Sequence, residues 1–290
     1  MKIAIIDKKD INIKLENESI KIDRQNIPFK LVDMLILNHK VNLNTSDILK
    51  LTKNKISILL LSHDNKNTSL IASSNSKAGE LKLSQYKALE KRLKLAKYFL
   101  TNKIKTHIEH LKYFSKDINH QNIFYDIDNA QDIDTLLGLE GSFAKAYFKE
   151  YFLLFSKEFQ TTTRTKHPPL DPLNSLLSYL YSLFYNIITV KLLSYGFEPT
   201  IGYLHTPFRT HNALSSDLLE LFRAEINHTV YNILQNNILQ KSDFAKKGGV
   251  YLKWSGRVKI HKEFIKLNQV LKSKLDVEIA TLKRMINEVS

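Results

Sequence analysis

Three acidic residues and one histidine lie in segments whose pattern suggests a ligand site. Glu140 is flanked by Gly138 and Gly141, His205 follows Gly202 closely, and Asp217 and Glu220 lie three residues apart in a helical pattern. Carboxylates and an imidazole together are ligands for a hard divalent cation. Because the chain has a formal net charge of +14 at pH 7, the natural substrate of such a metal is a phosphodiester.

Each of these residues also has an ordinary structural explanation. On a helix, Glu140 leads an apolar stripe, so it needs a cation, a hydrogen-bond network or a proton; alternatively, it only favours a helix N-terminus. Asp217 and Glu220 project together from a helix expected over residues 214–226, and the alternative is a solvated acid pair in its first turn. His205 is one of ten histidines, and His167 and His211 are the competing imidazoles.

The composition limits the class of protein. Forty-three Lys and Arg residues against 29 Asp and Glu residues, with a pI near 9.6, favour a polyanionic partner such as nucleic acid, although compositional bias alone also produces a basic chain. The absence of cysteine excludes disulfides, thiol catalysis and cysteine-ligated metal centres. No signal peptide and no apolar run of membrane-spanning length are evident, so we expect a cytoplasmic protein without membrane association.

The periodicity of apolar residues predicts an α+β protein. The first ~70 residues alternate or form short apolar runs, which indicates strands with a hairpin turn near Asn17 and a short helix over 48–51. From Leu81 the period is helical to the C-terminus. We therefore predict a small N-terminal β-rich domain (1–72), a linker (73–80) and a larger all-helical catalytic domain (81–290) that binds metal and DNA.

Basic residues concentrate in two helical segments, 81–112 and 241–290, which predicts positive stripes along DNA phosphates. Residues 164–174 form a proline-rich entry to a long apolar helix, for which Asn174 or Ser175 is the expected N-cap. Arg164 and Lys166 can bind a phosphate where that helix begins. The residues predicted to contact DNA are Arg164, Lys166, Asn174 and Arg223.

Four motifs, in this order and spacing, carry a family resemblance: residues 136–148, 164–181, 196–205 and 214–223. They resemble the CRISPR-associated integrase/endonuclease family, the catalytic subunit of spacer acquisition, and the resemblance covers essentially the whole chain. Two departures are mild, since Lys145 stands where arginine is common and Leu180 where glycine is common. Lys145 puts an arginine-type phosphate contact in doubt.

The resemblance implies a β-domain that forms a homodimer and a helical domain that holds one Mn²⁺ or Mg²⁺. It assigns Glu140, His205 and Glu220 as metal ligands and catalytic residues, and it places Asp217 in a neighbouring position that orients a ligand or metal-bound water. It also implies a small ferredoxin-fold CRISPR adaptation protein as partner, and the joining of prespacer 3′-ends to the CRISPR repeat by transesterification.

Two other functions stay open at this point. One is a structure-selective DNA nuclease of repair, which has the same site but does not integrate. The other is a non-catalytic helical DNA-binding module whose acids are structural.

Overall fold

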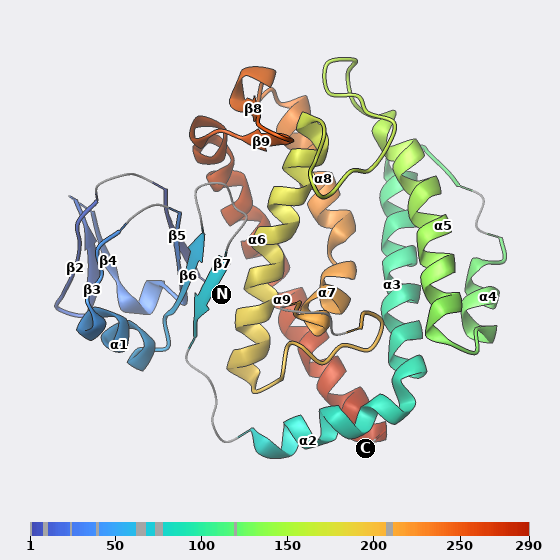
Figure 1. Cartoon of the computed structure of the whole chain (residues 1–290), viewed down its shortest axis with the longest axis horizontal. Coiled ribbons are helices and arrows are strands. Elements are labelled where there is room, and N and C mark those ends of the chain that lie inside the picture. The colour runs from blue at the N-terminus through green and yellow to red at the C-terminus, as the bar shows by residue number, and fades with distance from the viewer. Residues whose placement is uncertain are drawn as a thin grey trace.

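The protein consists of two β-sheets followed by a bundle of helices (Figure 1). The structure is a computed structural model that describes residues 2–7, 11–23, 25–38, 41–61, 68–72, 78–118, 121–206 and 211–289. The predicted α+β class, with a β-rich N-terminal part before a mostly helical part, is confirmed.

The N-terminal part contains a four-stranded and a three-stranded sheet. The first has the order β1-β5-β6-β7, in which β1, β5 and β6 are parallel and β7 is antiparallel to β6; the second is an antiparallel β2-β3-β4 meander. The expected hairpin is confirmed between β2 and β3, where Asn17 and Glu18 have φ values of 46° and 54°. The elements are β1 (Ile3–Ile6), β2 (Ile13–Glu16), β3 (Ser19–Ile22), β4 (Gln25–Pro28), the 3-10 turn η1 (Phe29–Leu31), β5 (Met34–Leu37), α1 (Thr45–Lys53), β6 (Ser57–Leu61) and β7 (Thr68–Ile71).

The four-stranded sheet is buried on both faces, which explains its continuous apolar runs. Leu35 and Leu37 on β5 pack against the three-stranded sheet. Met34 and Ile36, which alternate with them, belong to the core of the helical part. The sheet and the helices therefore share one hydrophobic core.

A buried ion pair also joins the two parts of the chain. The carboxylate of Asp7, just after β1, lies 3.0 Å from Nε of Arg257 near the start of α9 (Trp254–Val289), and both side chains are 1% exposed. The indole N–H of Trp254 donates to the carbonyl of Asp7, and the Asn38 amide donates to its carboxylate. Residues 73–77 of the predicted linker lie outside the described residues, so the domain boundaries stay a prediction.

The helical part is built around α6 (Figure 1). Helices α7 and α8 lie between α6 and α3, and α5 packs on the other side of α3. The elements are α2 (Gly79–Lys87), the 3-10 turn η2 (Ala88–Lys91), α3 (Arg92–Tyr113), α4 (Ile123–Asn129), α5 (Ile133–Phe152), α6 (Pro172–Tyr195), α7 (Ala213–Glu220), α8 (Arg223–Gln235), the 3-10 turn η3 (Lys241–Asp243) and α9.

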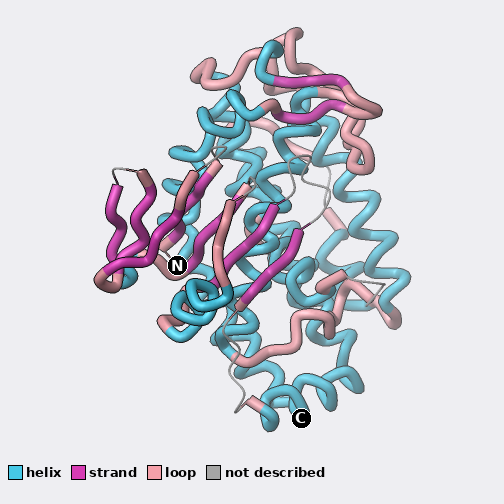
Figure 2. The backbone as a smooth tube through the Cα atoms, turned by 60° about the vertical axis from the view of Figure 1, so that its left-hand side comes forward, coloured by secondary structure: helices cyan, strands magenta, loops and turns pink. Residues whose placement is uncertain are grey.

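The prediction that this part is all-helical is wrong at one hairpin. Strands β8 (Phe244–Lys246) and β9 (Val250–Leu252) pair in antiparallel fashion, apart from the N-terminal sheets in Figure 2. Gly248, with φ of 65°, turns the chain between them. Strands of three residues are too short to show the two-residue alternation from which a strand is predicted.

Helix α6 is the one helix in the described part of the chain that is long and apolar enough to cross a membrane, but 72% of its apolar window is buried inside the protein. A helix that is apolar on all sides is typical of the centre of a bundle. Neighbouring helices cover α6 here, and this burial explains why α6 is apolar on all sides.

Candidate functional site

Glu140 lies in the third turn of α5. The sequence-based alternative, a position at the helix N-terminus, is therefore wrong. The helix begins at Ile133, where the side chain of Asp132 accepts a hydrogen bond from the Thr135 amide (2.7 Å). Because charge–dipole attraction fades beyond the first turn, helix-terminus stabilisation does not explain Glu140. It does lead the expected apolar face, on which Phe143 and Tyr147 are buried.

The helix expected over residues 214–226 is two helices, α7 and α8, with a break at Leu221 and Phe222. Asp217 is completely buried and Glu220 is 2% exposed. A solvated acid pair is therefore wrong for these two residues. Each buried carboxylate instead has specific partners, as buried charges require.

Asp217 organises the loop that carries His205. Its Oδ2 accepts the amides of Tyr203 (2.6 Å) and Leu204 (3.1 Å), and its Oδ1 accepts the amide of His205 (2.8 Å). Arg92 at the start of α3 donates to the carbonyls of Tyr203 and Leu204 from the other side.

The loop also packs closely on α7 at Gly202. A Cβ atom there would lie 2.7 Å from backbone of Ala213, so only glycine fits this approach. The loop is thus held by a carboxylate, a guanidinium and close packing together.

Each ring nitrogen of His205 faces a carboxylate. Its Nδ1 lies 2.8 Å from Oδ1 of Asp217, so the N–H at Nδ1 donates to the carboxylate and Nε2 faces Glu220, 4.0 Å from Oε1. Burial alone would lower the pKa of His205, but the hydrogen bond with Asp217 and the charge of Glu220 raise it overall. A carboxylate behind an imidazole in this way fixes the tautomer of metal-binding histidines.

The competing histidines have other hydrogen-bond partners or line another cavity. The Nε2 of His211 is 3.0 Å from the hydroxyl of Ser216, and its ring stacks on Tyr185. His167 lines a neighbouring cavity. Of the three candidates, His205 is the one whose ring contacts Glu220.

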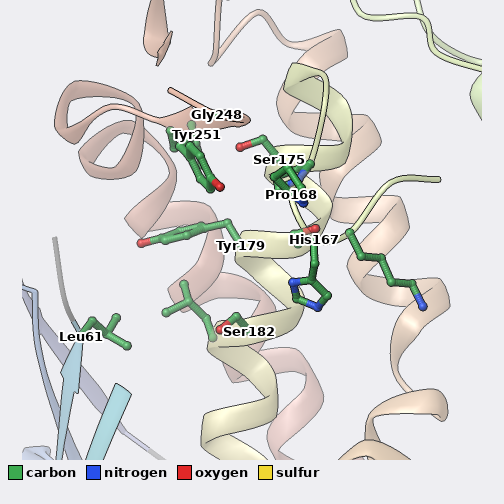
Figure 3. A pocket seen from close by; sticks show the side chains of 13 residues that line it. Leu61, His167, Pro168, Ser175, Tyr179, Ser182, Gly248 and Tyr251 are labelled. Carbon is green, nitrogen blue, oxygen red and sulfur yellow. The ribbon is translucent and has the colours of Figure 1, made fainter. Parts of the chain in front are cut away.

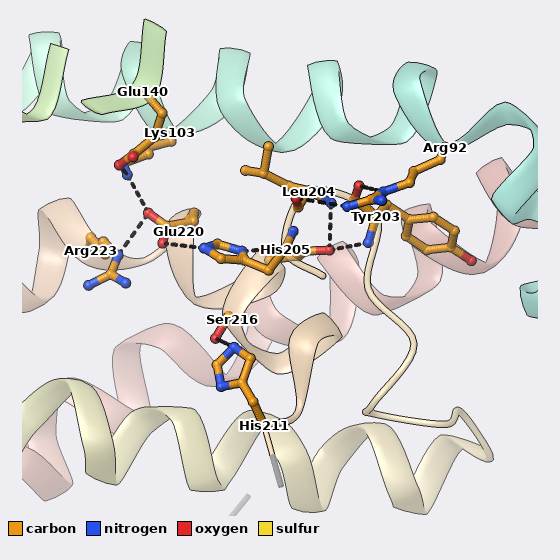
Figure 4. Close-up of polar contacts among 11 residues, drawn as sticks. Arg92, Lys103, Glu140, Tyr203, Leu204, His205, His211, Ser216, Glu220 and Arg223 are labelled. Atoms are coloured by element: carbon orange, nitrogen blue, oxygen red, sulfur yellow. Dashed lines mark hydrogen bonds and ion pairs between the residues drawn. The ribbon is translucent and has the colours of Figure 1, made fainter. Parts of the chain in front are cut away.

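Lys103 on α3 lies between Glu140 and Glu220 (Figure 4). It was not among the site residues predicted from the sequence. Its ammonium contacts Oε1 of Glu140 and lies 2.6 Å from Oε2 of Glu220. The side chain is 5% exposed, so it does not belong to the basic surface predicted for residues 81–112. A signal was present, because Lys103 continues the apolar stripe of Phe99 and Leu100 at helical spacing.

Glu220 has a second cationic partner in Arg223. The guanidinium Nε donates to Oε2 of Glu220 at 2.8 Å, and the same group lies 4.5 Å from the centre of the Tyr181 ring. Burial would raise the pKa of Glu220, but Arg223 and Lys103 lower it well below its ordinary value. Glu220 is therefore a carboxylate at neutral pH.

The donor set fits a hard divalent cation. Glu140 and Glu220 reach the Lys103 ammonium from different helices, and Nε2 of His205 faces the other carboxylate oxygen of Glu220. Oxygen ligands with one imidazole suit Mg²⁺ or Mn²⁺. Among the described residues no group of three or more His, Cys, Asp or Glu side chains is spaced to hold a metal ion, and the ammonium of Lys103 lies between the two acids.

The loop before α6 is shaped by Arg164 and Asn174. The expected N-cap at Asn174 or Ser175 is wrong, since Asp171 caps the helix by accepting the Asn174 amide (2.8 Å). Asn174 has no exposed surface. Its Oδ1 accepts from Arg164 (2.9 Å), which also donates to Ser178 (3.0 Å). Both side chains are therefore used within the protein.

Lys166 on the same loop lines a small cavity with the acids, His205 and Arg223. Burial lowers its pKa. Lys166 also borders a second cavity of about 550 Å³ between α6, β9 and the end of β6 (Figure 3). Figure 3 labels Ser175, Tyr179 and Tyr251 among its lining residues, so this cavity offers hydroxyls and aromatic rings.

Comparison with known proteins settles the family. The family model described as "CRISPR associated protein Cas1" matches residues 3–266. The chain belongs to the Cas1 family. It is 30% identical over 284 residues to the CRISPR-associated endonuclease Cas1 1 of Thermodesulfovibrio yellowstonii, a match that covers 90% of this chain and 89% of that protein. The resemblance predicted from the four motifs is thereby confirmed.

Solved structures agree on the fold. A Cas1 protein from Thermotoga maritima superposes with a TM-score of 0.87 at 21% identity over 95% of this chain and 94% of that one. A casposase bound to integration product gives 0.81 at 24% identity over 92% and 82%. A Cas6-RT-Cas1–Cas2 complex gives 0.79 at 18% identity over 99% of this Cas1-family chain and 35% of that chain.

Proposed function

We propose that this Cas1-family protein is a divalent-metal-dependent DNA endonuclease and integrase that joins prespacer 3′-ends into the CRISPR repeat. One observation carries the proposal: carboxylates from α5 and α7 converge on a single cation position beside an imidazole that a buried carboxylate orients. Three ligands of this kind leave further coordination positions for water and phosphate oxygens.

In the proposed site, Glu140, Glu220 and Nε2 of His205 hold one Mn²⁺ or Mg²⁺. When bound, the ion polarises the scissile phosphate and stabilises charge on the transferring oxygens. Asp217 keeps His205 in the tautomer that leaves Nε2 free.

Two cations of the protein complete the proposed phosphate site. Lys166 and Arg223 line the same small cavity as the acids, and we propose that they bind the non-bridging oxygens of the phosphate. We propose that Arg164 and Asn174, predicted as DNA contacts, act chiefly by shaping the loop that carries Lys166. The attacking group is a DNA 3′-hydroxyl in integration and water in cleavage.

The surface of α5 beside Glu140 supports the approach of a large substrate. Gly138 and Gly141 are exposed, and a Cβ at either would meet nothing within 4 Å. Glycine inside a helix costs roughly 1 kcal/mol relative to alanine, and nothing within the protein requires it at these two positions. A DNA backbone passing over this face of α5 would use the space that they leave.

The partners follow from the family and from charge. We propose a homodimer formed through the β-domain, a small ferredoxin-fold adaptation protein as second subunit, and action in the cytoplasm on prespacer and repeat DNA. The net charge of +14 supports a steep decrease of DNA affinity with salt.

A strand-transfer assay tests the proposal. It combines a labelled duplex with free 3′-hydroxyls, a supercoiled plasmid carrying a CRISPR repeat, the small partner protein and Mn²⁺. Wild type and Glu150→Gln are expected to join the DNA, whereas Glu140→Gln is expected to bind DNA without joining it. Glu150 is the matched control because it lies on α5 and pairs with Lys116 at 3.6 Å, away from the site.

Two results would contradict the proposal. Cleavage without joining by wild type would favour a repair nuclease. Equal joining by Glu140→Gln and wild type would show that Glu140 is not a metal ligand, and no metal-dependent product from any protein that still binds DNA would favour a non-catalytic module.

A further inference from the structure

Lys103 places a full positive charge at the centre of the acidic site. Its ammonium contacts Glu140 and Glu220, which come from separate helices, and Figure 4 shows it between them. The side chain is 5% exposed. An ammonium removed from water is stable only with close anionic partners, and both partners of Lys103 are the carboxylates to which the proposed function assigns the metal.

We propose that the ammonium of Lys103 is the resident cation of the metal-free site, and that a divalent ion binds by exchanging with it. This inference rests on the proposed function, because it takes Glu140 and Glu220 as metal ligands. The ammonium of Lys103 and the divalent ion would bind the same two carboxylates. Two positive charges that close together repel each other strongly when little water lies between them. Metal binding therefore requires that Lys103 leave its position.

The structure supplies a reason for a resident cation. Without metal and without Lys103, the partly exposed Glu140 and the buried Glu220 would face each other with no cation between them, and two neighbouring carboxylates destabilise each other's charged state. Arg223 cannot bridge the two acids in place of Lys103, because its Nε donates a hydrogen bond to Glu220 and its guanidinium lies over the Tyr181 ring. Lys103 bridges the acids and so keeps the ligands ionised and in place before metal arrives.

The side chain has a place to move to. Lys103 lines the small cavity that Lys166 and Arg223 also line, and a lysine stem has enough rotatable bonds to move its ammonium by several ångströms. In that cavity the displaced ammonium faces the position of the phosphate oxygens. The exchange would thus convert Lys103 from a partner of the ligands into a partner of the substrate.

The experiment compares Lys103→Met with Lys105→Met. Lys105 lies two residues further along α3 and is exposed, so its substitution removes one positive charge without touching the acids. Thermal unfolding in chelator and Mn²⁺ affinity by calorimetry are measured for both. We expect Lys103→Met to melt at lower temperature than Lys105→Met in chelator, and to bind Mn²⁺ more tightly than wild type by about tenfold or more, the factor that corresponds to a modest change in a buried charge pair.

A second variant, Lys103→Arg, separates the effect of the lost charge from an effect on folding. Lys103→Arg retains the positive charge, so its Mn²⁺ affinity is expected to equal that of wild type or to be weaker. Folded Lys103→Met with unchanged or weaker Mn²⁺ binding would overturn the inference, and so would tighter binding by Lys103→Arg.

Failure of the proposed metal site gives a different pattern. If wild type does not bind Mn²⁺, or if Glu140→Gln binds it as wild type does, the ligand assignment itself is wrong and the exchange falls with it. If Glu140→Gln abolishes binding while Lys103→Met changes nothing, the metal site stands and only the resident cation is wrong.

Discussion

Replacing Asp217 with asparagine should destabilise the protein strongly although it removes no volume. The carboxylate is completely buried and accepts four hydrogen bonds, two at each oxygen. Asparagine has the same shape but one oxygen and one NH₂ group. If the NH₂ group faces Tyr203 and Leu204, it meets two N–H donors; if it faces His205, it meets the backbone N–H, and Nδ1 can accept from it only in the tautomer that protonates Nε2.

The magnitude follows from the number of bonds lost. Hydrogen bonds to a charged group contribute about 1.5–3 kcal/mol each, and one or two of the four are lost in Asp217→Asn. The expected decrease in the free energy of unfolding is therefore about 1.5–6 kcal/mol. Because His205 also loses its anionic partner, we expect Mn²⁺ affinity to fall about 10–100-fold.

Urea unfolding of metal-free protein measures the first effect, with Asp276→Asn as control. Asp276 pairs with Lys191 at 2.8 Å, but its side chain is 35% exposed, so the loss of this pair should cost only about 0–1 kcal/mol. If Asp217→Asn unfolds within about 1 kcal/mol of wild type, Asp217 does not organise the loop as we describe.

Three further predictions concern other parts of the molecule. Gly141→Ala should raise the free energy of unfolding by about 1 kcal/mol, because its Cβ meets no atom and alanine favours the helix; a loss of stability in thermal unfolding would contradict this. Burial lowers the pKa of His107 to about 3 and of His110 to about 4, so only the unfolded chain takes up protons as pH falls below about 6.5. Stability is full above that pH and decreases below it by about 1.4 kcal/mol per histidine at pH 5.5; urea unfolding should show that His110→Gln removes about half of that loss, and an unchanged pH slope would refute the assignment. Arg257→Met should cost about 3–5 kcal/mol, because it leaves Asp7 buried without its cation; chemical unfolding close to wild type would show that the pair does not tie the β-sheet to α9.

The sequence predicted the β-domain well because its strands leave a clear signal. Runs such as Met34–Leu37 are apolar without alternation since the sheet is covered on both faces. The hairpin at Asn17 was equally visible, because a polar pair separates two alternating segments. Glu140 and Glu220 stood out as candidate site residues for a similar reason, since acids beside apolar helical stripes are rare without a partner.

Other features have no such signal. The break between α7 and α8 falls at Leu221 and Phe222, which continue the helical pattern without glycine or proline. Asp132 and Asp171 are the N-caps, but other polar residues nearby are equally plausible caps in the sequence. Only the folded backbone decides which side chain reaches an amide of the first turn. Lys103 was counted as surface charge because its partners lie 37 and 117 positions away in the chain, a pairing that only tertiary structure creates.

The most direct test of the central claim is anomalous diffraction from crystals of the wild-type protein soaked in Mn²⁺. The account predicts one strong anomalous peak within coordination distance of Glu140, Glu220 and Nε2 of His205. It also predicts that the Lys103 ammonium has moved away from both carboxylates. A peak at Asp217 or elsewhere, or a saturated crystal in which Lys103 still bridges Glu140 and Glu220, would contradict the account.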